Sequence, residues 1–317
     1  MRQIPVPATL SDAAKAFLRQ PPPQFQRPTN PQAWKAYAVL INKVMVDVLG
    51  PAVAAQPVTL EAGEINGTPV FTATPEGARP GAVVLYVHGG SFVLGSGRAA
   101  GLHGALEAVR NRATVWAVDF RVPPEHPYPA GMDDCVAVYR GLLETHAPGA
   151  IMVLGASSGA SLAVGAVLKA LDEGLPQPGG VALLSPLLDL TEGGDTFRSL
   201  QGLDRNLQEG TAACNALYAG RHDPKGPYLS PVFAEFPKGF PPTLITSGTR
   251  DLFLSNAVVF HRKLRRQGVY ADLNVWEAAP HGGFNGGAPE DSELYWEVKR
   301  FFDRCWNAVI PVAPPPR

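Results

Sequence analysis

The stretch that decides the fold reads Ile151-Met152-Val153-Leu154-Gly155-Ala156-Ser157-Ser158-Gly159. It opens with a short apolar run that is typical of a buried strand, and a helical pattern follows over 159–173. Between them lies the pattern Gly-x-Ser-x-Gly, which occurs once in the chain. A serine in such a strand-turn-helix context projects its oxygen above the end of a sheet, and small flanking residues prevent a clash. The pattern favours Ser157 as a nucleophile over Ser158 and Ser161.

Short apolar runs and helical patterns alternate on both sides of this stretch. A fold with that rhythm has a mostly parallel sheet covered by helices on both faces, so an α/β class is predicted. A hairpin around Asn66-Gly67 precedes the alternation, and helices over 12–20 and 31–49 precede the hairpin. The predicted strands cover 82–87, 114–118, 151–154, 181–184, 243–246 and 271–276, and the predicted helices between them cover 101–110, 132–145, 159–173 and 255–267.

The alternation fails between Asp189 and Pro241, where the sequence is irregular and rich in glycine and proline. A long insertion in an α/β fold is usually a functional lid or cap. We therefore expect N-terminal helices over 1–52 that belong to a cap, a core over 53–189, a cap insertion over 190–238 and the rest of the core over 239–317. The aspartates of the insertion, Asp195, Asp204 and Asp223, are expected to be solvated charges.

The composition of the chain limits which kinds of partner and which cellular compartment are expected. The chain has 317 residues, 45% of them hydrophobic, with 27 basic and 28 acidic side chains and a net charge of −1. No basic excess is present to neutralise phosphates, which argues against nucleic acid as a partner. The three cysteines, Cys135, Cys214 and Cys305, lie far apart without metal-ligand spacing, as is typical of a reducing compartment. With neither a signal-like segment at Met1–Pro7 nor a sufficiently apolar window, a cytoplasmic protein that does not use a membrane is expected.

A serine nucleophile needs a histidine base and an acid that orients it, and in this type of fold they follow the serine in the order acid, histidine. His281 lies in a loop just after the last predicted strand, whereas His261 lies in a basic helical run that suggests a solvated face. His281 is therefore the predicted base. Asp251, just after the strand over 243–246, is the predicted acid, and Asp189 is the alternative.

The stretch His88-Gly89-Gly90-Ser91 directly follows a predicted strand. Two glycines let backbone amides approach a reacting carbonyl, so Gly89, Gly90 and the amide of Ser158 are the predicted oxyanion donors. His88 itself is expected to have a structural hydrogen-bonding role. Phe92, Val93 and Leu94 follow this loop and are expected to line the substrate pocket.

Three motifs together resemble those of the hormone-sensitive-lipase-like esterases, a branch of the α/β-hydrolases. They are His88–Phe92, the proline-rich segment Asp119–Ala130 and Gly155–Gly159, and the resemblance covers roughly residues 60 to 305. It implies the α/β-hydrolase fold with a helical cap, the triad Ser157, Asp251 and His281, structural roles for Asp119 and Glu125, and acyl-ester substrates without a cofactor or metal.

The chain departs from the family pattern at three places. Ser91 replaces a third glycine, which leaves open which loop amides donate; Ala156 replaces a common aspartate; and two glycines separate His281 from Phe284. None of these removes a catalytic group.

The sequence therefore predicts a serine carboxylesterase for short- to medium-chain acyl esters. A lactonase or amidase with the same triad is an alternative, and a silent hydrolase-fold protein that binds a small ligand is a third. A second copy of the chain can pair at the sheet edge near 271–276, which would give a homodimer.

Overall fold

In the computed structural model, which describes residues 4–22, 28 and 30–308, one eight-stranded sheet has the order β1-β2-β4-β3-β5-β6-β7-β8. Its strands are β1 (Val58–Ile65), β2 (Thr68–Pro75), β3 (Val83–Val87), β4 (Thr114–Val118), β5 (Ile151–Ala156), β6 (Gly180–Leu184), β7 (Thr243–Gly248) and β8 (Ala271–Trp276). β2 pairs antiparallel with β1 and β4, and every other pairing is parallel. The predicted α/β class, the hairpin and all six later strands are confirmed.

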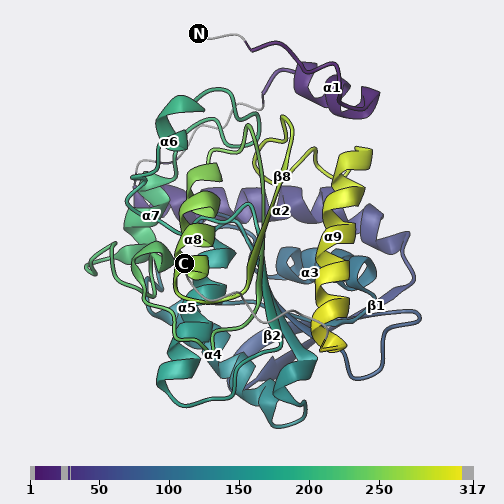
Figure 1. The fold of residues 1–317 in the computed structure, drawn as a ribbon, viewed down its shortest axis with the longest axis vertical. Helices are drawn as coiled ribbons and strands as arrows, with labels where there is room; N and C mark the ends of the chain where they lie inside the picture. The colour runs from purple at the N-terminus through teal and green to yellow at the C-terminus, as the bar shows by residue number, and fades with distance from the viewer. Residues whose placement is uncertain (1–3, 23–27, 29, 309–317) are drawn as a thin grey trace.

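The helices alternate with these strands. They are α1 (Asp12–Arg19), α2 (Pro31–Ala54), α3 (Arg98–Asn111), α4 (Ala130–Leu143), α5 (Gly159–Asp172), α6 (Thr196–Ser199), α7 (Ala212–Ala219), α8 (Leu254–Arg266) and α9 (Pro289–Trp306), with short 3-10 turns η1 (Pro148–Ala150) and η2 (Pro231–Phe233). In Figure 1 the sheet runs down the centre, with α4, α5 and α8 on one side and α3 and α9 on the other.

The two faces of the sheet bury different cores because side chains alternate along a strand. On β3, Val83, Leu85 and Val87 contribute to a core that also includes residues of α4, α5 and α8. Val84 and Tyr86 contribute to a second core with α3 and α9. A buried parallel strand is apolar on both faces, which explains why these strands are continuous apolar runs in the sequence.

The short helices α6 and α7 lie in the stretch that was expected to be irregular, and two longer helices also differ from the prediction. α2 was expected to end at Gly50-Pro51, but it continues for another turn to Ala54, with Pro51 inside it. An internal proline lacks the amide hydrogen bond and crowds the carbonyl four residues earlier, so it often ends a helix, but here the last turn persists. α9 was not predicted, although Pro289 at its start, Glu290 and Asp291 in its first turn, and its buried Val298 and Phe301 form a regular helical pattern.

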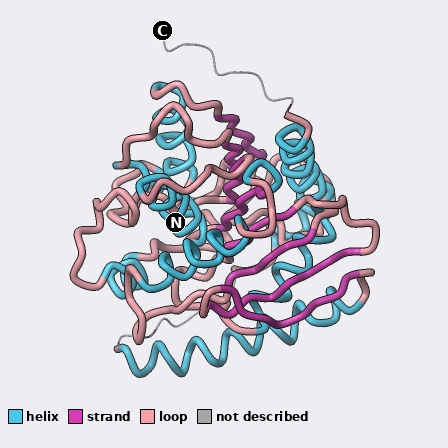
Figure 2. The backbone as a smooth tube through the Cα atoms, turned by 90° about the horizontal axis from the view of Figure 1, so that it is seen from below, coloured by secondary structure: helices cyan, strands magenta, loops and turns pink. Residues whose placement is uncertain are grey.

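The long helix α2 runs along one side of the molecule, at the bottom of Figure 2. Trp34 is buried, whereas Val39, Leu40, Val44 and Val48 are exposed. Gln32–Ala54 is long and apolar enough to cross a bilayer by length and composition, a test that helices of soluble proteins also pass. The expectation that the protein does not use a membrane remains a prediction.

The packing of α9 gives a direct test of the second core. Phe301 is fully buried, whereas Trp296, on the same helix, is 62% exposed. We expect Phe301→Ala to lower the free energy of unfolding by about 3–5 kcal/mol, because the truncation leaves a cavity. Trp296→Ala should lower it by less than about 1 kcal/mol. Chemical denaturation of both variants measures the difference, and equal losses would contradict the packing described.

Candidate active site

Ser157 lies in a strained turn between β5 and α5. Its φ angle is 53°, in the left-handed region that residues other than glycine rarely adopt, at a cost of about 1–3 kcal/mol. Two backbone hydrogen bonds hold the turn: the Ser157 amide donates to the Leu184 carbonyl at 2.8 Å, and the Ser157 carbonyl accepts from the Leu187 amide at 3.0 Å. The turn is thereby anchored to the end of β6.

The same turn needs glycine at 159. A Cβ at this position would lie 2.3 Å from the carbonyl oxygens of Val87 and His88, at the end of β3. A Cβ at Gly155 would similarly lie 2.8 Å from Ala160 Cα. The glycines of the motif therefore allow α5 to begin directly beside the loop that leaves β3.

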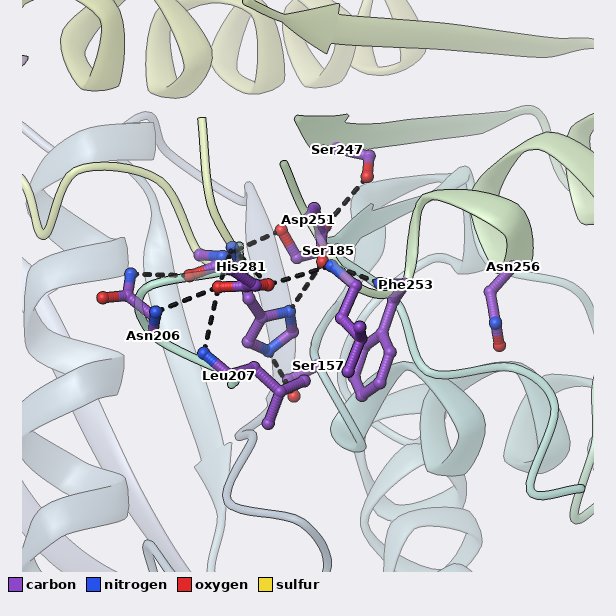
Figure 3. A network of polar contacts seen from close by, with 12 residues as sticks. Ser157, Ser185, Asn206, Leu207, Ser247, Asp251, Phe253, Asn256 and His281 are labelled. Atoms are coloured by element: carbon purple, nitrogen blue, oxygen red, sulfur yellow. Dashed lines mark hydrogen bonds and ion pairs between the residues drawn. The ribbon is translucent and has the colours of Figure 1, made fainter. Parts of the chain in front are cut away.

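His281 lies between Ser157 and Asp251 (Figure 3). Its Nε2 is 2.9 Å from Ser157 Oγ, and its Nδ1 is 3.1 Å from Asp251 Oδ1. Nδ1–H donates to the carboxylate, and the serine hydroxyl can then donate to Nε2. Phe253 packs edge-on against the imidazole, with ring centroids 4.7 Å apart. The structure thus brings together the three residues that the sequence singled out.

Asp251 is fully buried at the end of β7 and is held by two further donors. The Ser247 hydroxyl donates to its Oδ2 at 2.8 Å, and the Phe253 amide donates to its Oδ1 at 3.0 Å. Burial alone would raise its pKa, but the interaction with His281 and these hydrogen bonds outweigh burial and lower the pKa. Asp251 is therefore ionised at neutral pH.

The pKa of His281 responds in the opposite direction. Burial alone would lower it, but the charge of Asp251, the hydrogen bond to that carboxylate and the charge of Asp204 outweigh burial. The pKa of His281 therefore lies above its ordinary value of 6.5. This environment stabilises the imidazolium that forms when the histidine accepts a proton from serine.

The loop after β3 passes close to the serine. A Cβ at Gly89 would lie 3.0 Å from Ser157 Cβ and from the Ala156 carbonyl oxygen, so glycine permits this approach. The Phe92 amide donates to Ser158 Oγ at 3.1 Å, and the amides of Val93 and Leu94 donate to the Gly90 carbonyl.

The predicted oxyanion amides are left available by these bonds. In the part of the chain that the structure describes, the amides of Gly89, Gly90 and Ser158 donate to no protein acceptor, and neither does that of Ser91. The loop can therefore offer amides at three consecutive residues.

The alternative serines have other partners. Ser158 is fully buried and accepts from the oxyanion loop, while Ser161 donates to the Leu187 carbonyl. Neither interacts with His281 in the described residues. The two serines brace the nucleophile turn.

The alternative histidines and acid also lie outside the triad. His261 is partly buried rather than on a solvated face, and its Nε2 lies 3.2 Å from the Ala271 carbonyl on β8. His88 is buried and stacks on Phe120 with centroids 4.3 Å apart, and burial lowers its pKa to about 4. Asp189 accepts hydrogen bonds from Thr191.

The prediction that Asp204 is a solvated charge is wrong, because its side chain is fully buried beside the triad. It accepts hydrogen bonds from the amides of Leu207 and Leu252 at 2.9 Å and of His281 at 3.1 Å. Burial, and next the charge of Asp251, raise the pKa of Asp204 to about 6. Asp204 therefore joins the insertion to the loops that carry both Asp251 and His281.

Asn206 strengthens this connection. Its side-chain amide donates to the carbonyl of His281 at 2.8 Å (Figure 3). The same amide donates to the carbonyl of Gly283 at 3.0 Å. Sequence reasoning missed Asp204 and Asn206 because their partners lie 48 to 77 residues away in the chain. The one local signal is the irregular stretch itself, which interrupts the alternation of strand and helix.

A cavity of about 460 Å³ opens beside Ser157 and His281. Its lining includes Gly89, Gly90 and Ser91 from the oxyanion loop and Met45 from α2. Phe92, Val93 and Leu94, which were expected to line the pocket, are not part of its wall. Phe92 stacks on Tyr218 with centroids 4.0 Å apart, and Val93 and Leu94 pack with Trp34.

The N-terminal helix α2 covers the oxyanion loop. Asn42 accepts from the Gly95 amide at 2.7 Å, and Lys35 forms an ion pair with Glu125 at 2.8 Å. On the other side of the loop, Asp119 accepts from the Gly97 amide at 2.7 Å. Glu125 and Asp119 thus both hold segments around the site without reaching Ser157.

No group of three or more histidine, cysteine, aspartate or glutamate side chains is arranged to hold a metal within residues 4–22, 28 and 30–308. The three cysteines are all free thiols, and Cys135 and Cys214 are buried.

The chain is similar in sequence to known proteins. Residues 84–285 match a protein family described by its α/β-hydrolase fold. An acetyl-hydrolase from Streptomyces hygroscopicus is 34% identical over 66% of this chain and 71% of its own length. An esterase from Acinetobacter venetianus is 32% identical over 69% of this chain and 74% of its own length.

Solved structures of esterases are also similar to this chain. The crystal structure of an esterase called E25 has a TM-score of 0.89 at 34% identity and covers 95% of this chain and 96% of its own. That of EstE7, a hormone-sensitive-lipase homologue from a metagenome library, has a TM-score of 0.81 at 30% identity and covers 94% of this chain and 100% of its own.

The contact between Asp204 and the His281 loop can be tested by NMR titration of the His281 ring. We expect Asp204→Asn to lower the pKa of His281, because the substitution removes a negative charge that raises it. The variant should also lose about 1–3 kcal/mol of stability, because an amide oxygen cannot satisfy every donor that the carboxylate accepts. Asp189→Asn, at a buried aspartate that does not contact His281, is the matched control. An unchanged His281 pKa in Asp204→Asn would contradict the electrostatic role.

Proposed function

The chain belongs to the α/β-hydrolase family, in its hormone-sensitive-lipase-like branch, and we propose that this carboxylic-ester hydrolase acts on short- to medium-chain acyl esters through an acyl-enzyme. The observation that carries the proposal is the continuous set of contacts from Asp251 through His281 to Ser157, beside free backbone amides at the wall of a cavity. The size of that cavity suits a small ester.

In the first half of the reaction, Ser157 Oγ attacks the ester carbonyl while His281 Nε2 accepts its proton. Asp251 stabilises the imidazolium and keeps the ring in the tautomer that leaves Nε2 free to accept. The negative oxygen of the tetrahedral intermediate receives hydrogen bonds from the loop amides and from Ser158, each worth a factor of about 10²–10³ in kcat. The imidazolium then protonates the leaving alcohol.

The second half repeats these steps with water. His281 takes a proton from the water as it attacks the acyl-enzyme, and the same amides hold the new oxyanion. Ser157 leaves with the proton that His281 returns.

The assignment of 190–238 and the N-terminal helices as a cap belongs to the same proposal. It is supported by Leu207 and Met45, which lie in the cavity wall and come from these two segments. Limited proteolysis of the insertion outside 204–207 should change the acyl-length preference before it abolishes activity.

We also propose a cytoplasmic protein that pairs with a second copy along β8. The free thiols suit a reducing compartment, and β8 lies at the edge of the described sheet. Cell fractionation and light scattering test the two statements separately.

Ser157→Ala tests the nucleophile. We expect hydrolysis of p-nitrophenyl esters, from acetate to dodecanoate, to fall by roughly 10⁴-fold or more, because no other group forms the acyl-enzyme. Ser292→Ala, which removes an exposed hydroxyl on α9 outside the active-site cavity, should keep most of the activity. Full activity in Ser157→Ala would refute the assignment, and a preference for the matching anilide would favour an amidase.

The pH dependence tests the base. His281 must be neutral to accept a proton, so kcat/KM should rise with pH and level off above an apparent pKa that exceeds 6.5. In Asp251→Asn, kcat should fall by roughly 10³–10⁴-fold and the apparent pKa should decrease. A wild-type profile that is already level below pH 6 would be incompatible with His281 as the base.

A further inference from the structure

The active-site cavity continues into a polar region that the proposed triad chemistry does not use. Five of the residues that line it are Tyr86 from β3, His103, Glu107 and Arg110 from α3, and Tyr295 from α9. We call this group the α3–α9 pocket. Tyr86 belongs to the core on the α3 and α9 side of the sheet, so the pocket extends from Ser157 along that face.

Glu107 and Arg110 compensate each other's charge inside the pocket. The carboxyl group of Glu107 accepts a hydrogen bond from the Arg110 guanidinium, and the Glu107 residue is only 4% exposed. The same guanidinium lies 3.5 Å from the centroid of the Tyr295 ring, in cation–π geometry. Apart from the histidines, the cavity lining contains no other charged side chain. The pocket therefore has no net charge with which to attract an ionised group.

Hydrogen-bonding groups in the same cavity nevertheless remain free. The Thr246 hydroxyl is buried in the cavity wall without a partner among the described residues. The Tyr86 hydroxyl and the His103 ring likewise make no hydrogen bond within the described ranges. Burial lowers the pKa of His103 to about 4, so its neutral ring offers one donor and one acceptor.

Buried polar groups without partners are costly, and a plain aliphatic chain in this pocket would leave them unsatisfied. A carboxylate or an ammonium group would find no free opposite charge there. A hydroxyl group can both donate and accept, and it matches the groups that remain free.

We propose that the α3–α9 pocket receives an uncharged, hydroxyl-bearing part of the ester substrate. The proposal rests on the proposed function and narrows its substrate class to hydroxylated esters. The hydroxyl can belong to the acyl half or to the alcohol half, and the two arms of the test separate these cases.

The acyl arm compares p-nitrophenyl 3-hydroxybutyrate with p-nitrophenyl butyrate. The alcohol arm compares 2,3-dihydroxypropyl butyrate with propyl butyrate. In the wild-type protein we expect kcat/KM for the hydroxylated ester to exceed that for the plain ester by about 3- to 10-fold in at least one arm, the range of one or two neutral hydrogen bonds.

Tyr86→Phe removes only a hydroxyl group and should reduce that ratio by about 3-fold or more. Thr246→Val should also reduce the ratio, and it provides a second test if Tyr86→Phe does not fold. Tyr139→Phe removes a buried tyrosine hydroxyl that bonds to the Pro176 carbonyl in the core of the opposite face, and it should leave the ratio unchanged. Thermal unfolding shows which variants are folded.

A wild-type preference for the plain ester in both arms would overturn the α3–α9 pocket proposal, as would an unchanged ratio in both Tyr86→Phe and Thr246→Val. In either case, Ser157-dependent hydrolysis of the plain esters would leave the proposed function standing. Failure to hydrolyse any of the four esters would instead overturn the proposed function together with the inference.

Discussion

The site depends on a close approach of two backbones, the turn that carries Ser157 and the loop that leaves β3. A side chain at 159 would collide with the carbonyls of Val87 and His88, and one at 89 would crowd Ser157 itself. Glycine at both positions lets the nucleophile and the oxyanion amides share one small volume. The parallel order β3-β5-β6-β7-β8 then brings the loops with Asp251 and His281 to the same end of the sheet.

The sequence predicts those features of the fold and the site whose residues are close together in the chain. The turn at Ser157 was predictable because strand, turn and helix are contiguous, and His281 and Asp251 because each follows a recognisable strand. Asp204 has no such signal: its role arises from three backbone amides brought to it by the fold, two of them distant in the chain. The pocket wall was mispredicted for a similar reason, since Phe92 follows the oxyanion loop but its ring stacks on Tyr218 in the core.

The two faces of the sheet differ in what they contribute beside the serine. The face covered by α4, α5 and α8 is an apolar core that fixes the turn, and Ser158 and Ser161 satisfy backbone groups there. On the face covered by α3 and α9, the buried side chain of Glu107 and the partly buried side chain of Arg110 reach the cavity. One face of the sheet thus holds the Ser157 turn in place, and the opposite face supplies the polar side chains of the proposed substrate pocket.

The hydrogen bonds from Asp204 and Asn206 to the His281 loop have a consequence for protein engineering. Exchanging the whole insertion for that of a relative, in order to change specificity, would also remove the supports of the histidine backbone. A chimera that retains 204–207 and replaces only the flanking segments would preserve those supports. The segments of the insertion that flank 204–207 can therefore be exchanged, whereas 204–207 must stay with the rest of the enzyme.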